Sequence, residues 1–305
     1  MNSPHISVLL KEVLDVFKDL DQGDFLDCTL GYAGHSSAIL KAHPKINLFA
    51  CDKDIEALNF SKKILSNFPN KITFKHIGFK DILKEIPLLN LKGILADIGV
   101  SSLQLDKNDR GFSLQSDFLD MRMNQNQKLS AKDIVNLYSQ EELERIFREY
   151  GDLGNLSRSL AHKIVQSRNI REILSAKELS NIIGTAKFQG RRVSVALLVF
   201  QALRIEVNNE LDELKKLLVE IEKARLKDCK FAIISFHSLE DRLIKNTFKK
   251  WEKDCICDDK AIKCECGKNH SLGKILSKKA ISASKEEVRY NSRSSCAKMR
   301  IFYFR

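Results

Sequence analysis

Strand-like and helical segments alternate through the first hundred residues of the chain, and this alternation restricts the fold more than any other feature. The strand-like segments are 24–30, 46–52, 71–77 and 93–99. Helical patterns such as "HSSAILKAH" and "DIEALNFSKKILSNF" separate the first three of them. Strands that alternate with helices are typical of βαβ units in a doubly wound parallel sheet. We therefore predict an α/β fold built on such a sheet.

The same pattern returns only near the end of the chain. "KFAIISF" (230–236) reads as a fifth strand, and "KILSKKAI" and 298–304 read as a further pair. Between the fourth and fifth strands the sequence carries helix signals and almost no strand signals. A helical block inside an α/β chain is best explained as an inserted domain. We expect this domain at 112–205, inside an α/β domain made of 1–111 and 206–305.

Helix boundaries within this block can be read from capping patterns. Three serine–acid pairs resemble capping boxes: Ser130 with Asp133, Ser139 with Glu142, and Ser175 with Glu178. The segment 194–207 is apolar on nearly every side and predicts a buried helix. The next helix keeps four apolar residues on one face, which we expect to cover the sheet: Leu211, Leu214, Leu218 and Ile221.

Composition and charge restrict the location and the partners. The 305 residues contain no run of about 18 apolar residues, so we expect no membrane span. The apolar run near the N-terminus is very short and is followed by the acidic Glu12, which does not fit a signal peptide. We therefore expect a cytoplasmic protein. The net charge of +11 suits a polyanion such as nucleic acid, but a solvated basic surface would have the same charge. Four basic residues within 157–171 leave RNA contact and a solvated helix face equally open: Arg158, Lys163, Arg168 and Arg171.

Four of the eight cysteines form a C-x-C-x6-C-x-C cluster made of Cys255, Cys257, Cys264 and Cys266. Zinc is commonly bound by four thiolates, usually from C-x2-C pairs. The C-x-C spacing is less typical, so we favour a metal-free loop of thiols and predict no metal, with zinc as the alternative. Three other cysteines, Cys28, Cys51 and Cys229, lie in or beside apolar strand-like segments and are expected to be buried.

A glycine-spaced turn follows the first strand in "DCTLGYAGHS" (27–36). Asp52 ends the second strand, 21 residues after Gly31. In nucleoside-binding folds such a turn presents backbone amides to the ligand, and a carboxylate on the next strand binds the ribose hydroxyls. The full phosphate-binding glycine pattern is absent, which favours a nucleoside without phosphates. S-adenosylmethionine (SAM) is such a ligand, and its carboxylate would lie at the helix N-terminus near Gly34.

Longer motifs stand in order along the whole chain: "HISVLLKEVL", "DCTLGYAGHS", "LADIGVSSLQLD", "RGFS", "LDMRM", "FQALRIEVNNEL", "ISFHSLEDR" and "NSRSSCAKMRI". Together they resemble the RsmH (MraW) family of SAM-dependent methyltransferases that act on bacterial small-subunit ribosomal RNA. The resemblance implies a class I (Rossmann-like) methyltransferase fold with an inserted helical domain. It also implies methylation of N4 of a P-site cytosine, position 1402 in the usual 16S rRNA numbering, within the small ribosomal subunit.

The resemblance also assigns cofactor-binding residues. Those carried over from the family's motifs are Ala33, Gly34, His35, Asp52, Phe79, Asp97 and Gln104. Asp52 matches the ribose-binding acid, and Phe79 matches the residue beside the adenine. Asp97 stands where related amino-methyltransferases place an acceptor for the target amine, so we assign it the catalytic role. "DIGV", which begins at Asp97, lacks the Asp-Pro-Pro-Tyr motif of those enzymes.

Three positions depart from the family pattern. Ala33 replaces a glycine, which would be tolerated only if its φ is negative. Phe118 replaces Gly-Pro, and Leu197–Val199 replaces Thr-Arg-Thr, so no role of that arginine transfers.

Two other functions are weighed: a DNA amino-methyltransferase, which the missing Asp-Pro-Pro-Tyr disfavours, and a zinc-containing RNA-binding or ribosome-assembly protein that keeps a nucleoside pocket. A homodimer also stays open.

Overall fold

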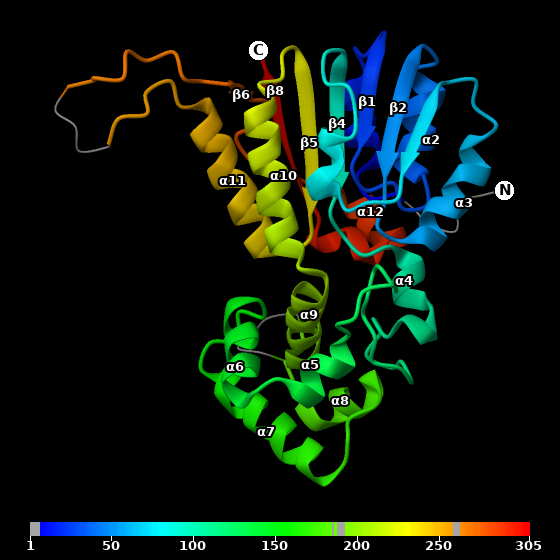
Figure 1. Cartoon of the computed structure of the whole chain (residues 1–305), viewed down its shortest axis with the longest axis vertical. Helices are drawn as coiled ribbons and strands as arrows, with labels where there is room; N and C mark the ends of the chain where they lie inside the picture. Colours follow the sequence, from blue (N-terminus) through cyan, green and yellow to red (C-terminus); the bar gives the residue numbers. More distant parts are fainter. Residues whose placement is uncertain (1–6, 185, 188–192, 259–262) are drawn as a thin grey trace. The chain divides into compact units, whose positions relative to one another are not determined.

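The computed structural model describes residues 7–184, 186–187, 193–258 and 263–305. The chain divides into two compact units, one made of residues 1–99 and 212–305 and the other of 100–211 (Figure 1). The sequence-based boundaries at 112 and 205 both lie inside the second unit. The second unit therefore includes more of the flanking chain than the helix signals indicated.

The first unit is built on one twisted sheet. Its strands are β1 (Gly23–Asp27), β2 (Ile46–Cys51), β3 (Ile72–Lys75), β4 (Leu91–Asp97), β5 (Cys229–Ser235), β6 (Gly273–Ile275), β7 (Ile281–Ser282) and β8 (Lys298–Phe304). They lie in the order β3-β2-β1-β4-β5-β8-β6, with β7 also paired to β8. Strands β1 to β5 are parallel, and β8 is antiparallel to β5. The predicted doubly wound sheet is confirmed, and its strand order reverses between β1 and β4.

Helices cover both faces of this sheet (Figure 1). One face packs against α1 (Leu10–Phe17), α2 (Gly34–Ala42) and α3 (Ile55–Leu65). The other face packs against the 3-10 helix η1 (Phe79–Lys84), α10 (Glu210–Ala224) and α11 (Ser238–Glu252). Successive strand residues alternate between the faces, so Phe25 joins the first core and Leu26 the second. Two short helices, α12 (Lys285–Tyr290) and η3 (Ser292–Cys296), precede β8.

The second unit is helical, as predicted. It contains α4 (Ser102–Asp106), η2 (Asn108–Arg110), α5 (Ala131–Leu137), α6 (Gln140–Glu149), α7 (Leu156–Ile170), α8 (Ala176–Ile183) and α9 (Val195–Asn208). Helix α9 is the predicted buried helix. Its Leu198 and Val199, which replace polar family residues, are buried in the core of this unit. Leu197 of the same helix is 49% exposed.

Capping explains where three of these helices begin. Ser130 and Ser139 form full capping boxes with Asp133 and Glu142, as predicted. The third expected box is incomplete. Ser175 accepts a bond from the Glu178 amide, but the Glu178 carboxylate binds the Leu174 amide and the Arg171 guanidinium instead.

The expected cover of the sheet by α10 is confirmed for Leu214, Leu218 and Ile221, which are buried in the core with Leu217. Leu211 lies in the second unit and is only half-buried. No helix among the described residues is both long enough and apolar enough to cross a bilayer.

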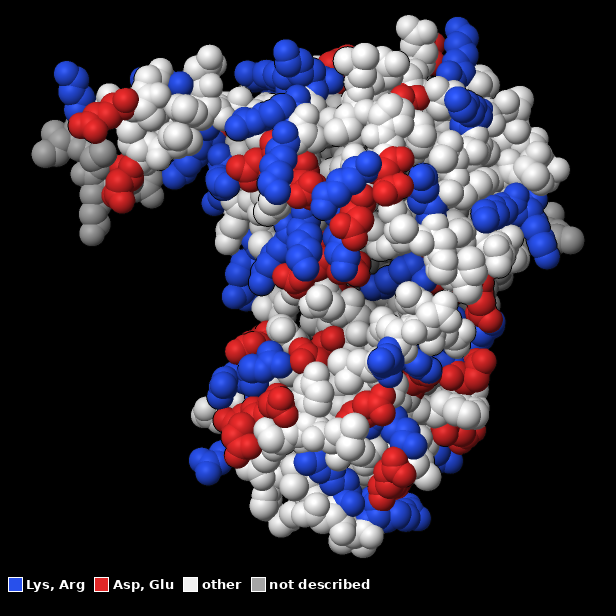
Figure 2. Space-filling view, in the orientation of Figure 1, with Lys and Arg blue, Asp and Glu red and all other residues white. Residues whose placement is uncertain are grey.

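Charged side chains of both signs cover the face formed by α10 and α11 (Figure 2). Lys250 Nζ lies 2.8 Å from the Glu222 carboxylate, and Lys216 Nζ lies 2.7 Å from that of Asp212. Because lysines and acids are interleaved here, this face does not concentrate the basic excess of the chain.

A candidate cofactor site at the carboxyl ends of the strands

Three aspartates lie at the ends of neighbouring parallel strands. Asp27 ends β1, Asp97 ends β4, and Asp52 directly follows β2. The carboxyl ends of parallel strands meet at one edge of a sheet, where open α/β folds bind ligands. The structure therefore brings the predicted Asp52 and Asp97 to one edge. It adds Asp27, which is not among the predicted site residues although it opens the quoted "DCTLGYAGHS" motif.

Backbone amides hold the Asp52 carboxylate in place. The Gly31 amide donates to Oδ2 at 2.8 Å, and the Asp54 amide donates to Oδ1 at 2.8 Å. Gly31 adopts a φ of 50°, a conformation that glycine reaches without strain. Each carboxylate oxygen keeps a second lone pair, so Asp52 can still accept bonds from two hydroxyl groups.

The next turn residues differ from the expectation. Ala33 has a φ of 59°, so the expectation that an alanine is tolerated here only at negative φ is wrong. The residue is fully buried, and its amide donates to the Leu30 carbonyl at 2.8 Å, which holds the left-handed turn despite the methyl group. At Gly34 an added Cβ would collide with the Ser7 hydroxyl. Packing of the segment before α1 is therefore sufficient to explain this glycine.

His35 connects this turn to Asp97. Its Nε2 lies 2.9 Å from the Val8 carbonyl, and its Nδ1 lies 3.8 Å from Asp97 Oδ2. A carbonyl can only accept, so Nε2 carries the proton and Nδ1 presents a lone pair toward Asp97. Burial lowers the pKa of His35 to about 4, and the ring is neutral at pH 7. His35 therefore lies beside Asp97 as a neutral ring.

Asp97 is the most perturbed of the three acids. Burial, followed by the charges of Asp27 and Glu240, raises its pKa to about 8. Its backbone amide donates to the Thr29 hydroxyl at 2.7 Å, while its Oδ1 is buried without a hydrogen-bond partner among the described residues. Asp97 is thus mostly protonated at pH 7, and it offers an unused acceptor oxygen.

Asp27 and Asp52 titrate closer to neutrality than ordinary aspartates. Burial raises the pKa of each to about 6, against hydrogen bonds that lower it. The Ser36 hydroxyl donates to Asp27 Oδ2 at 2.6 Å. The positive charge of Lys53 lowers the pKa of Asp52, as the last of the causes acting on it. An edge lined by three acids in a low-dielectric setting favours a positively charged ligand.

The remaining predicted residues lie elsewhere. Phe79 begins η1, after β3 at the same sheet edge, and packs against the core that contains α10. Gln104 belongs to α4 of the second unit, where its amide and side chain bond to Ser101, so it stays a prediction. Glu240 was missed as a contributor to the site, although the quoted "ISFHSLEDR" contains it. It caps α11 by accepting bonds from the Phe236 and His237 amides.

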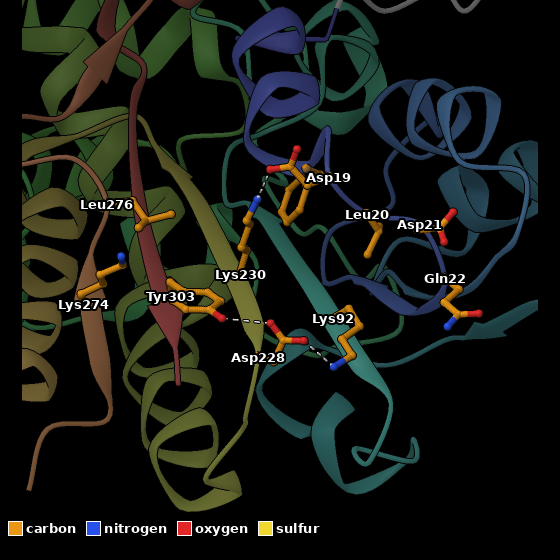
Figure 3. Close-up of a pocket in the computed structure, with 11 residues that line it drawn as sticks. Asp19, Leu20, Asp21, Gln22, Lys92, Asp228, Lys230, Lys274, Leu276 and Tyr303 are labelled. Carbon is orange, nitrogen blue, oxygen red and sulfur yellow. Dashed lines mark hydrogen bonds and ion pairs between the residues drawn. The ribbon is translucent and has the colours of Figure 1, made fainter.

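A pocket of about 590 Å³ lies at the opposite, amino-terminal edge of the sheet (Figure 3). Its lysines and acids contact one another, since Lys92 lies 2.7 Å from Asp228, and Lys230 lies 3.4 Å from Asp19. Tyr303 also donates to Asp228 at 2.9 Å. Because these charges neutralise one another and no predicted site residue lines the pocket, we place the site at the carboxyl edge.

The basic segment of the second unit is partly engaged within its own unit. Arg168 donates to the Val135 carbonyl at 2.8 Å, and Arg171 pairs with Glu178. Arg158 and Lys163 of α7 are exposed. Two of the four basic side chains therefore have structural partners, and the other two face solvent.

Comparison with known proteins gives consistent matches over the whole chain. The family model described as the MraW methylase family matches residues 2–305. "Ribosomal RNA small subunit methyltransferase H" of Campylobacter lari is 75% identical over 305 residues, which is all of both chains. The protein of that name from Campylobacter jejuni subsp. jejuni is 59% identical over all of this chain and 98% of its own length.

Among solved structures, a putative rRNA-methylase from Clostridium thermocellum aligns with 98% of this chain and 99% of its own. The identity is 10% and the TM-score 0.38, which is too low to support an argument.

Proposed function

Since this chain belongs to the MraW methylase family, we propose that it transfers a methyl group from SAM to small-subunit ribosomal RNA. The family match over residues 2–305 carries this conclusion. The target atom, N4 of the cytosine at position 1402 of 16S rRNA, follows from the motif resemblance. It is preferred over a DNA amine because the Asp-Pro-Pro-Tyr motif is absent.

The residues at the carboxyl edge fit SAM. Asp52 has acceptor lone pairs for two ribose hydroxyls, and its orientation is fixed by the Gly31 and Asp54 amides. SAM carries a sulfonium and an ammonium, and the acidic edge suits both charges. The turn at Ala33–His35 is assigned to the cofactor, as are Phe79 and Gln104. When bound, SAM supplies an electrophilic methyl group on sulfur.

Asp97 is assigned to the target amine. The N4 lone pair of cytosine is delocalised into the ring, so the amine is a poor nucleophile. An acceptor on N–H concentrates that lone pair on nitrogen and orients it. Asp97 Oδ1 is buried and without a partner among the described residues, and a nearby cation would favour the ionised carboxylate. In its protonated form, before the cation arrives, the Asp97 carboxyl would be oriented by the lone pair of His35 Nδ1.

The partner follows from the same family. We assign recognition of rRNA within the small subunit to the helical second unit, with Arg158 and Lys163 as phosphate contacts. A cytoplasmic location is proposed because the substrate is assembled there. The alternative of a binding protein without activity would retain SAM affinity but transfer no methyl group.

The assignment of Asp97 is tested with Asp97→Asn, which keeps the shape and an acceptor oxygen. Single-turnover methylation of small subunits that lack the modification should slow by about 10²-fold or more. The affinity for SAM should fall less, because charge on the amine develops only in the transition state.

Asp24→Asn is the matched control, since Asp24 is a buried aspartate at the other end of β1 and bonds to Asn47. Equal losses of rate and SAM affinity in Asp97→Asn would reduce Asp97 to a cofactor ligand. An unchanged rate would remove it from the site.

A further inference from the structure

The four cysteines of the C-x-C-x6-C-x-C cluster converge in space. Cys255 Sγ lies 3.6 Å from the Sγ atoms of Cys264 and Cys266, which are 3.7 Å from each other. Cys257 completes the group, and all four sulfurs lie within 4.8 Å of one another. The four thiols therefore form one compact cluster.

The spacing of the sulfurs matches that of a metal site. Zinc–sulfur bonds of about 2.3 Å in a tetrahedron place the sulfurs about 3.8 Å apart. The three sulfur–sulfur separations given above, 3.6 to 3.7 Å, lie close to this edge length. A disulfide would need about 2.05 Å.

Backbone amides point at two of the sulfurs in a nearly symmetric way. The residue inside each C-x-C pair donates to the second cysteine of the other pair: Ile256 to Cys266 at 3.4 Å, and Glu265 to Cys257 at 3.3 Å. The Cys266 amide also donates to Cys257 at 3.3 Å. Amide donors stabilise thiolate charge and orient metal-bound sulfur. Two C-x-C turns packed in this way form a built ligand set.

The surrounding segment offers little else to hold these turns together. It connects α11 to β6, and its described parts extend away from the sheet in Figure 1. Backbone bonds from Leu272 to Trp251 and from His270 to Asp254 close its base. Beyond that base, Ile256 is 63% exposed and Cys264 is exposed. In the described parts of this connection, 253–258 and 263–272, there is no helix or strand and no fully buried side chain, so it needs another source of order.

We propose that Cys255, Cys257, Cys264 and Cys266 bind one structural zinc ion. All four positions of the tetrahedron are filled by protein sulfur, so the site is closed. His270 is not needed as a ligand, because its Nε2 is engaged with the Cys266 carbonyl at 3.0 Å. Zinc is preferred over iron because the site is exposed and zinc has no redox chemistry. The sequence alone favoured a metal-free loop, and the convergence of the sulfurs reverses that preference.

The site is tested by elemental analysis of the full-length protein purified without chelators. We expect about one zinc per chain in the wild type. Cys255→Ser/Cys257→Ser and Cys264→Ser/Cys266→Ser should each contain less than about a tenth of this. Cys296→Ser is the matched control, because Cys296 is an exposed cysteine outside the cluster, and it should keep the zinc.

A second measurement does not depend on the folding of the variants. Cobalt exchanged into the wild type should give the visible absorption of a tetrahedral tetrathiolate site. If the wild-type protein contained no zinc and its four cluster thiols were reactive, the loop would be metal-free and the proposal would be wrong. Iron in place of zinc, disulfides within the cluster, or zinc lost in Cys296→Ser would also overturn the proposal.

Discussion

The raised pKa of Asp97 predicts how the stability of the ligand-free protein depends on pH. A buried acid with a raised pKa keeps its proton in the folded state while the unfolded chain releases it. Between the usual value of 3.8 and about 8, the folded state therefore binds more protons. Stability then falls as pH rises, by up to about 1.4 kcal/mol per pH unit for one group.

Asp97→Asn removes this dependence. Between pH 6.0 and 7.5 the wild type should lose about 2 kcal/mol of unfolding free energy relative to the variant. This figure is an upper value, because the Asp97 side chain is 17% exposed. The lowered pKa of His35 makes stability rise with pH, but only below the usual histidine pKa of 6.5. The pH dependence due to Asp27 and Asp52 levels off above their pKa values of about 6. All three residues are present in both proteins, so their contributions cancel when the two are compared.

Urea unfolding followed by the fluorescence of Trp251 provides the assay. Trp251 is the one tryptophan of the chain and is buried in the same unit as Asp97. Its signal therefore reports the unit that contains the site. Asp24→Asn controls for replacing a buried aspartate in that unit. A stability difference between wild type and Asp97→Asn that stays constant from pH 6.0 to 7.5 would refute the raised pKa.

Two further predictions concern SAM binding. Asp52→Asn should weaken SAM binding by about 1–3 kcal/mol, as expected when hydrogen bonds to a charged group are lost, and calorimetry with unchanged affinity would contradict the ribose assignment. SAM binding near pH 7 should release close to one proton from Asp97, measured by calorimetry in buffers of different ionisation enthalpy. Asp97→Asn should abolish this release, and a wild-type binding enthalpy that does not vary with buffer would count against it.

Most of the fold could be predicted from local patterns. The ends of the five parallel strands were located within three residues, because each is a short apolar run bounded by turns or helices. Ser130 and Ser139 marked helix starts for the same local reason. Glu178 did not complete the third box because Arg171 and Leu174 compete for its carboxylate, and such competition is invisible in a four-residue pattern.

Residues of the candidate site could be predicted only where their position at the end of a single predicted strand identified them. Asp52 and Asp97 follow from their places, Asp52 directly after β2 and Asp97 as the last residue of β4. The pKa of Asp97 is raised by its burial and by the charges of Asp27 and Glu240, and these causes depend on packing between segments far apart in the sequence. Ala33 shows the same limit, because its left-handed φ goes with a turn bond to the Leu30 carbonyl and with full burial, neither of which the sequence pattern encodes.

The stability slope and the proton release are two measurements of one quantity, the pKa of Asp97 in the ligand-free protein. If this pKa is about 8, about nine-tenths of the molecules carry the proton at pH 7 and about half at pH 8. Proton release on SAM binding should therefore decline over the same pH range in which the stability slope levels off. Agreement between the two curves would place the proton on Asp97 itself. A release that persisted above pH 9 would require a different group, because Asp97 would already be ionised before the ligand arrives.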